Sequence, residues 1–167
     1  MQLLDLDRVR YSGGGISAAQ KYFRKSQDSK GLMQLVYKVF YKIFASYRHL
    51  EISTTCSIGP GLYLGHVYNI TINPKAVIGK NCNIHRGVLI GQENRGKKEG
   101  TPTIGDCVWI GINACIVGNI KIGNDVLIAP NSYVNCDVPD HSIVFGNPCI
   151  IKHRDNATED YINRRIE

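Results

Sequence analysis

Aliphatic residues recur at every sixth position through much of the second half of the chain. They stand at Ile104, Ile110, Ile116, Ile122, Ile128 and Val134. The same period runs earlier through Ile52, Ile58, Leu64 and Ile70, shifts by two residues, and continues at Ile78, Ile84 and Ile90. An amphipathic helix would place apolar residues three and four positions apart, and a half-buried strand would alternate strictly. A six-residue period instead predicts stacked coils, in which each short face contributes one aliphatic side chain to a shared core.

The repeat divides the chain into three parts. Residues 51–152 are predicted to form an all-β core, a parallel β-helix of hexapeptide repeats that acts as a single domain. Residues 1–50 lack the repeat and are predicted to form a short N-terminal helical segment, with helices at about 18–25 and 32–50. Residues 153–167 are strongly charged, and we expect them to form a helical C-terminal tail.

The predicted helix over residues 32–50 is unusually apolar and must cover its hydrophobic side. We expect it to pack against the first β-coil or a neighbouring subunit. Contact with a membrane surface is the alternative, and Lys38 and Lys42 are compatible with either arrangement. The pattern does not by itself indicate membrane binding.

Composition and charge narrow the function classes. The net charge of +6 suits an anionic ligand such as a phosphorylated coenzyme, and equally suits nucleic acid or an anionic membrane surface. No helix-turn-helix, RNP-like or zinc-finger pattern is present, so we expect no nucleic-acid partner.

The six cysteines form no CxxC pair, and we expect neither a metal site nor a disulfide framework. No apolar run approaches the roughly 18 residues of a membrane span, and no secretory signal is visible, so we expect a cytoplasmic protein.

One polar insertion interrupts the repeat between Ile90 and Ile104. It runs from Gln92 to Thr101 and is rich in glycine and lysine, so we expect a protruding loop. Insertions of this kind often form the binding face of a repeat protein, and we predict substrate contacts from Gln92, Arg95 and Thr101. The alternative is a plain solvated loop.

His66 is the strongest candidate for catalysis because it lies where the repeat shifts register. Histidine is a suitable general base near neutral pH. Glu51, fifteen residues earlier, could stand at an adjoining level of the stack and fix the orientation of the imidazole. A structural surface histidine is the alternative reading of His66. His85, directly after Ile84, is the second candidate and is expected to contact the substrate.

A set of short segments, in a fixed order, carries a family resemblance. They are Glu51-Ile-Ser, Ser57-Ile-Gly, Leu64-Gly-His66, Val88-Leu-Ile-Gly91, Pro102-Thr-Ile-Gly105, Ile110-Gly111, Ile116-Val-Gly118-Asn-Ile and Val144-Phe-Gly-Asn-Pro148. Over about residues 50–152 the chain resembles the serine acetyltransferases. The resemblance implies a left-handed β-helix, homotrimers with active sites between subunits, and acetyl-CoA lying along the prism.

The resemblance also assigns roles. His66 matches the general base of the family and Glu51 its acidic partner, although aspartate is commoner there. The implied reaction is direct transfer of acetyl from acetyl-CoA to the hydroxyl of a small-molecule acceptor. The stretches that match the pantetheine-binding positions contain Gly111, Ile112, Ala129 and Pro130. Lys152 and Arg154 could reach the coenzyme phosphates, or could simply be solvated.

Three departures from the family pattern concern the acceptor. Gly65 replaces the acidic residue that usually precedes the base, and Gly100–Thr101 replaces an Arg-His pair that helps to hold the amino acid. The helical region is also short, as in relatives encoded with polysaccharide synthesis. A sugar hydroxyl is therefore an alternative acceptor, and a non-enzymatic β-helix scaffold is an alternative function. A zinc-dependent carbonic-anhydrase-like β-helix is a third.

Overall fold

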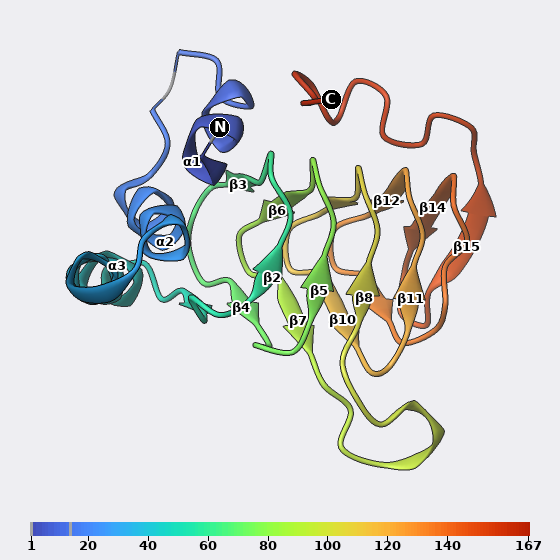
Figure 1. Cartoon of the computed structure of the whole chain (residues 1–167). Helices are drawn as coiled ribbons and strands as arrows, with labels where there is room; N and C mark the ends of the chain where they lie inside the picture. The colour runs from blue at the N-terminus through green and yellow to red at the C-terminus, as the bar shows by residue number, and fades with distance from the viewer. Residues whose placement is uncertain (1, 14) are drawn as a thin grey trace.

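The computed structural model describes residues 2–13 and 15–167, and it shows three helices followed by a parallel β-solenoid (Figure 1). Its short strands form three sheets, named here faces A, B and C. Face A contains β1 (Glu51–Ile52), β4 (Thr71–Ile72), β7 (Leu89–Gly91), β10 (Cys115–Val117) and β13 (Tyr133–Val134). Face B contains β2 (Ser57–Ile58), β5 (Val77–Ile78), β8 (Thr103–Ile104) and β11 (Lys121–Ile122). Face C contains β3 (Tyr63–Gly65), β6 (Asn83–His85), β9 (Trp109–Ile110), β12 (Val126–Ile128), β14 (Ser142–Phe145) and β15 (Ile150–His153).

The repeat aliphatics form the core of the solenoid, as the six-residue period predicts. On face C, Leu64 pairs with Ile84, Ile84 with Ile110, and Ile110 with Ile128. The last three side chains of this row are fully buried. Each inward residue therefore packs on the equivalent residue of the coil before it, as in other solenoids. The predicted fold class is confirmed, and the architecture is consistent with a left-handed β-helix.

The chain turns at three edges between the faces, which we name the A–B, B–C and C–A edges. Two departures from the repeat lie at these edges. The first is the two-residue shift in the sequence. Gly65 is in register with His85 and Thr71 with Leu89, so the extra residues lie in the C–A turn that begins at His66. The second is the polar insertion, which leaves the A–B edge as a protruding loop with a 3-10 turn at Gly96–Lys98 (Figure 1).

The N-terminal segment contains α1 (Leu3–Val9), α2 (Ala18–Asp28) and α3 (Gly31–Tyr47). The two predicted helices are present with somewhat different ends, whereas α1 was not predicted. A buried ion pair connects α1 and α2, with Arg24 Nε 2.7 Å from Asp7 Oδ2. Arg24 also donates to the carbonyl oxygens of Ile58 and Gly59, so the pair attaches both helices to the first coil.

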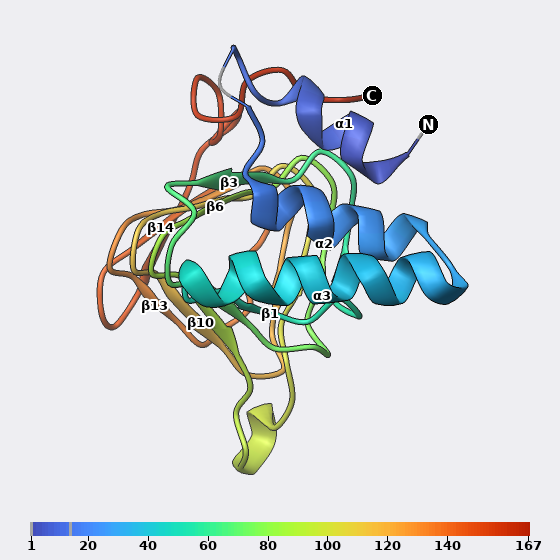
Figure 2. The ribbon, with the colours of Figure 1, turned by 90° about the vertical axis from the view of Figure 1, so that its left-hand side faces the viewer.

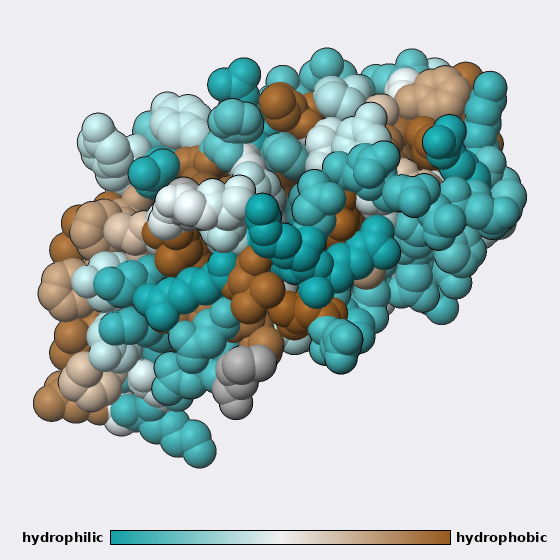
Figure 3. Space-filling model, turned by 90° about the horizontal axis from the view of Figure 1, so that it is seen from above, coloured by the Kyte–Doolittle hydropathy of each residue, from teal (hydrophilic) through white to brown (hydrophobic). Residues whose placement is uncertain are grey.

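Helix α3 packs on α2, and both run across the end of the solenoid that begins with β1 (Figure 2). Tyr41 and Ala45 are buried, whereas the side chains of Leu35 and Ile43 are 59% and 58% exposed. Apolar side chains gather at the left-hand end of the molecule seen from above, where these helices lie (Figure 3). The expected packing is thus made on one side of α3 only. Across the described residues, no helix combines the length and apolar character that a membrane crossing needs.

The C-terminal tail differs from the prediction, because residues 154–167 form successive turns instead of a helix. The tail folds back over face C, and Asp125 holds it there. Its carboxylate accepts hydrogen bonds from the backbone amides of Ala157 and Thr158, the Thr158 hydroxyl and His141 Nδ1. Burial alone would raise the pKa of Asp125, but the hydrogen bonds from Thr158, His141 and Ala157 bring this pKa below its ordinary value.

Replacing Asp125 with alanine should release the tail. The loss leaves buried donors without a partner, so we expect unfolding in urea to become easier by about 1–3 kcal/mol and the tail to become sensitive to protease. Because the pKa of Asp125 is lowered in the folded state, its contribution is present at neutral pH and is lost as the pH falls below about 4. Asp155→Ala is the control, since Asp155 pairs only with exposed His153. Equal stability of the two variants would contradict the role of Asp125.

Candidate active site

His66 stands at the C–A edge, directly after β3, and its side chain is exposed. Its backbone is in the left-handed region, with φ of 52°. The enlarged turn that follows is anchored to the chain around it: Arg48 Nη1 donates to the Val67 carbonyl oxygen, and the Tyr68 ring lies edge-on to His49 at 5.2 Å. The register shift seen in the sequence therefore presents a histidine on a supported bulge.

Glu51 lies beside the same edge, at the start of β1 on face A. Its exposed carboxylate accepts a hydrogen bond from Thr71 Oγ1 at 3.3 Å, one coil further along. Among the described residues it makes no hydrogen bond to His66. The structure thus places the two predicted partners on either side of one edge without joining them. Glu51 lines an open groove of about 540 Å³ along face A.

His85 lies on face C, in register with Gly65. A Cβ atom at position 65 would stand 2.4 Å from His85 Nδ1, so the imidazole occupies the space that a side chain there would need. Burial, and secondarily the charge of nearby His66, lower the pKa of His85 to about 4. Its Nε2 atom is buried and has no hydrogen-bond partner among the described residues. His85 is therefore a neutral imidazole next to the His66 turn at physiological pH.

The C–A edge also brings together residues predicted to contact the coenzyme. Backbone hydrogen bonds run along this edge from coil to coil: Arg86 donates to Gly65, Asn113 to Arg86, and Asn131 to Ile112. Gly111–Ile112 and Ala129–Pro130 accordingly form the next levels of the edge on which His66 stands. The coils are so close that a Cβ atom at Gly111 would lie 2.6 Å from the Pro130 nitrogen.

Arg86 occupies the level of this edge adjacent to His66, and its side chain is exposed. Sequence reasoning did not select it. The available signal was its position directly after His85, equivalent to that of His66 after Gly65. The edge therefore carries a cation between the candidate base and the predicted coenzyme surface.

The two predicted phosphate contacts are separated from that surface. Strand β15 runs antiparallel to β14, so Lys152 pairs with Ile143 on the terminal strand of face C. Arg154 lies further on, where its amide donates to the His141 carbonyl oxygen at the B–C edge. Within one chain, face C thus lies between Arg154 and the C–A edge, an arrangement that does not favour Arg154 as a partner of the same bound coenzyme.

The predicted loop contacts lie at the other side of face A. Gln92 Oε1 accepts from Asn73 Nδ2, and the Thr101 hydroxyl donates to the Lys75 carbonyl oxygen. Arg95 is exposed at the start of the 3-10 turn. The loop leaves the A–B edge, so within one chain Gln92, Arg95 and Thr101 are not brought together with His66.

The candidate catalytic groups that the structure places near each other are Glu51 on face A and His66 at the C–A edge. In the described ranges no group of three His, Cys, Asp or Glu side chains is arranged to hold a metal ion. What is present is an exposed histidine at one end of an edge built from close-packed turns. Residues 101–136 match the family model "Bacterial transferase hexapeptide (six repeats)".

The chain is similar to serine acetyltransferases in both sequence and structure. It is 39% identical over 99 residues to serine acetyltransferase 4 of Arabidopsis thaliana, a match that covers 59% of this chain and 28% of that protein. The chain therefore contains hexapeptide repeats, and its repeat region is similar to that of serine acetyltransferases. This likeness was predicted from the ordered motifs around His66 and Gly111, and it is confirmed.

Two solved structures extend the likeness. The Neisseria gonorrhoeae serine acetyltransferase in complex with serine superposes with a TM-score of 0.64 at 32% identity, covering 81% of this chain and 54% of that one. The Brucella abortus enzyme in complex with coenzyme A gives a TM-score of 0.68 at 28% identity, covering 81% and 55%. The chain therefore spans about half of these relatives, and 28% of the plant protein.

The environment of His85 can be tested by titration. We expect its imidazole to stay neutral down to about pH 4, which NMR titration of the ring would show. In Gly65→Ala, the new methyl group displaces the ring toward solvent, so the pKa should rise toward the ordinary value of about 6.5. Gly15→Ala is the control, because a Cβ atom there meets nothing within 4 Å. A wild-type His85 that titrates near 6.5 would contradict the buried placement.

Proposed function

We propose that this chain is an acetyl-CoA-dependent O-acetyltransferase that transfers acetyl directly to a hydroxyl group of a small molecule. The observation that carries the proposal is the exposed His66 on an edge shared with Ile112 and Pro130, in a fold related to enzymes with this chemistry. The similarity to serine acetyltransferases supports the reaction type, and the C–A edge places the candidate base His66 beside the predicted coenzyme surface.

In the proposed reaction, His66 removes the proton from the acceptor hydroxyl as its oxygen attacks the thioester carbonyl. The carbon–oxygen bond forms, the carbon–sulfur bond breaks, and the proton passes to the departing thiolate of coenzyme A. No covalent acyl-enzyme is needed. Glu51 is the proposed positioning residue, because its exposed carboxylate flanks the same edge and, among the described residues, hydrogen bonds only to the Thr71 hydroxyl.

The C–A edge suits the pantetheine arm of acetyl-CoA. Ile112 is partly exposed and Pro130 is exposed, so the edge offers apolar contact beside backbone amides. Arg86, one level above His66, adds a positive charge for an anionic coenzyme. Lys152 could reach the coenzyme from face C, while Arg154 is the weakest member of the predicted set.

A homotrimer would complete the site. The loop with Gln92, Arg95 and Thr101 projects from the A–B edge, away from His66 of its own chain. We propose that a neighbouring subunit brings its loop against the C–A edge, so that base and acceptor contacts come from different chains. We also propose a cytoplasmic location, which suits six cysteines without disulfides.

A sugar hydroxyl is the second candidate acceptor, and the packing at Gly65 favours it. His85 fills the space next to the base where an acidic side chain would stand, so no carboxylate is available there for the ammonium group of an amino acid. The replacement of an Arg-His pair by Gly100–Thr101 removes a carboxylate partner as well. An amino acid bound without these groups would keep poorly paired charges.

Removing the base should abolish turnover. In His66→Ala we expect the kcat of thiol release from acetyl-CoA to fall about 10²–10⁴-fold, with little change in acetyl-CoA binding, because only proton transfer is lost. The assay compares L-serine with neutral and acidic monosaccharides as acceptors. His153→Ala is the matched control, as this histidine is exposed on β15.

The outcomes separate the candidates. Turnover with serine supports the serine assignment, and turnover with sugars alone supports the second candidate. Full activity of His66→Ala would refute its role as the base. Wild-type protein that neither binds acetyl-CoA nor releases thiol with any acceptor would be a scaffold.

Subunit mixing tests the shared site. If His66 and Arg95 act in the same site from different chains, His66→Ala and Arg95→Ala proteins should each be impaired. Trimers assembled from an equal mixture should recover about a quarter of the wild-type activity, because about a quarter of their interfaces carry both intact residues. Light scattering checks the trimeric mass. No recovery in mixed trimers would place both residues in one chain's site.

A further inference from the structure

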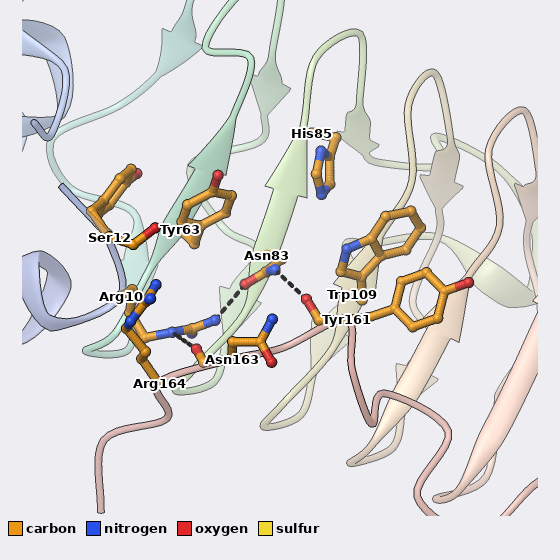
Figure 4. Close-up of a pocket in the computed structure, with 10 residues that line it drawn as sticks. Arg10, Ser12, Tyr63, Asn83, His85, Trp109, Tyr161, Asn163 and Arg164 are labelled. Atoms are coloured by element: carbon orange, nitrogen blue, oxygen red, sulfur yellow. Dashed lines mark hydrogen bonds between the residues drawn. The ribbon is translucent and has the colours of Figure 1, made fainter. Parts of the chain in front are cut away.

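A cavity of about 350 Å³ lies on face C, apart from the groove that contains Glu51. Its floor is formed by strands β3, β6 and β9. Arg10 and Tyr11 of the N-terminal segment form one wall, and Tyr161 and Arg164 of the tail form another (Figure 4). Its volume is within the range of small-molecule sites. Three segments distant in sequence therefore enclose a space that the proposed reaction does not use.

Arg10 is the central charge of this cavity. It is 4% exposed, and its guanidinium donates to the Gly61 carbonyl oxygen at 2.8 Å, Asn83 Oδ1 at 2.7 Å and the Asn163 carbonyl oxygen at 2.9 Å. All three acceptors are neutral, and two of the five N–H donors of the guanidinium have no acceptor among the described residues. Burial lowers the pKa of Arg10, because it disfavours the charged form of the guanidinium.

A second arginine adds positive charge to the lining of the cavity. Arg164 also lines this cavity (Figure 4), and no carboxylate is among the described lining residues. Arg10 forms no ion pair with any described residue. A buried, unpaired cation is costly, and an anion bound between two arginines would offset that cost.

Aromatic rings form the opposite side of the cavity. The ring centroids of His85 and Trp109 are 4.8 Å apart, and those of Trp109 and Tyr161 are 5.1 Å apart. On this wall, the Nε2 atom of His85 is buried and has no hydrogen-bond partner among the described residues. A sugar ring could place its nonpolar C–H groups against these aromatic rings, and one of its hydroxyl groups could hydrogen bond to Nε2.

A purely structural role for Arg10 explains only part of this arrangement. As a clamp, Arg10 joins the first two coils to the tail, and Asn83 Nδ2 reinforces it by donating to the Tyr161 carbonyl oxygen. The clamp does not account for a second arginine in the same cavity, for the lack of a carboxylate, or for the unpaired imidazole atom. All three are explained by an anion-bearing ligand.

We propose that this cavity binds a single sugar ring carrying a carboxylate or phosphate group. The anionic group binds Arg10 and Arg164, and the ring lies against Trp109 and Tyr161. The shared chemistry is a ring with hydroxyl groups and one anionic substituent, whether an acidic sugar or a sugar phosphate. This site is independent of turnover, so it can exist whether or not the proposed acetyl transfer is correct.

Trp109 provides a direct test, because it is the single tryptophan of the chain and lines the cavity. Its fluorescence is followed during titration with glucose 1-phosphate, glucuronate, glucose, inorganic phosphate and AMP. We expect a saturable change with glucose 1-phosphate, glucuronate or both, at concentrations at least about tenfold below those needed for glucose or phosphate alone. The two acidic ligands distinguish phosphate from carboxylate.

Arg164→Gln tests the charge without removing the buried clamp, since Arg164 is exposed and Arg10 makes the tail contacts. We expect this variant to bind the preferred acidic sugar at least about tenfold more weakly, with unchanged affinity for glucose. Arg8→Gln is the matched control, because Arg8 pairs with Asp5 outside the cavity. Wild-type affinity in Arg164→Gln, equal affinity for glucose and the acidic sugars, or tighter binding of AMP would overturn the proposal.

Discussion

The register of the solenoid depends on one constraint, the stacking of each inward aliphatic side chain on its equivalent in the adjacent coil. Ile84, Ile110 and Ile128 pair in this way on face C, and every strand pair of the solenoid follows the same register. A shift by one residue would turn these side chains toward solvent and polar ones into the core. Because the stacking fixes the positions of the core-facing side chains, extra residues are accommodated in the turns at the edges.

Functional candidates are found where the stack accommodates such residues. The longer C–A turn presents His66, and the insertion after β7 projects as a loop from the A–B edge. The regular turns between them align Arg86, Ile112 and Pro130 along a single edge. A repetitive scaffold thus provides both a rigid surface and two irregular positions for chemistry, a common division of labour in repeat proteins.

The flanking segments are held by polar contacts more than by the repeat. Asp7 and Arg24 attach the first helices, Asp125 attaches the tail, and Arg10 connects both termini to face C. Buried charges of this kind contribute little net stability compared with apolar packing, but they specify one arrangement of partners. In this chain they cover face C with aromatic and cationic groups, and the cavity is a consequence of that covering.

The sequence by itself determined the β-helix and the protruding loop, because a six-residue period places one aliphatic residue of each short face in the core. It located the two-residue shift only approximately, after Ile70, whereas the strand register places the extra residues between Gly65 and Thr71. The order of its motifs predicted the likeness to serine acetyltransferases, and that resemblance pointed to Gly111 and Pro130. The sequence did not determine the tail, whose charged residues suggested a helix although Asp125 holds them in turns. Nor did it show that Arg10 and Arg164 line one cavity, or that His85 packs on Gly65. Those contacts join residues far apart in the chain, and only the packing of coils, helices and tail in three dimensions decides them.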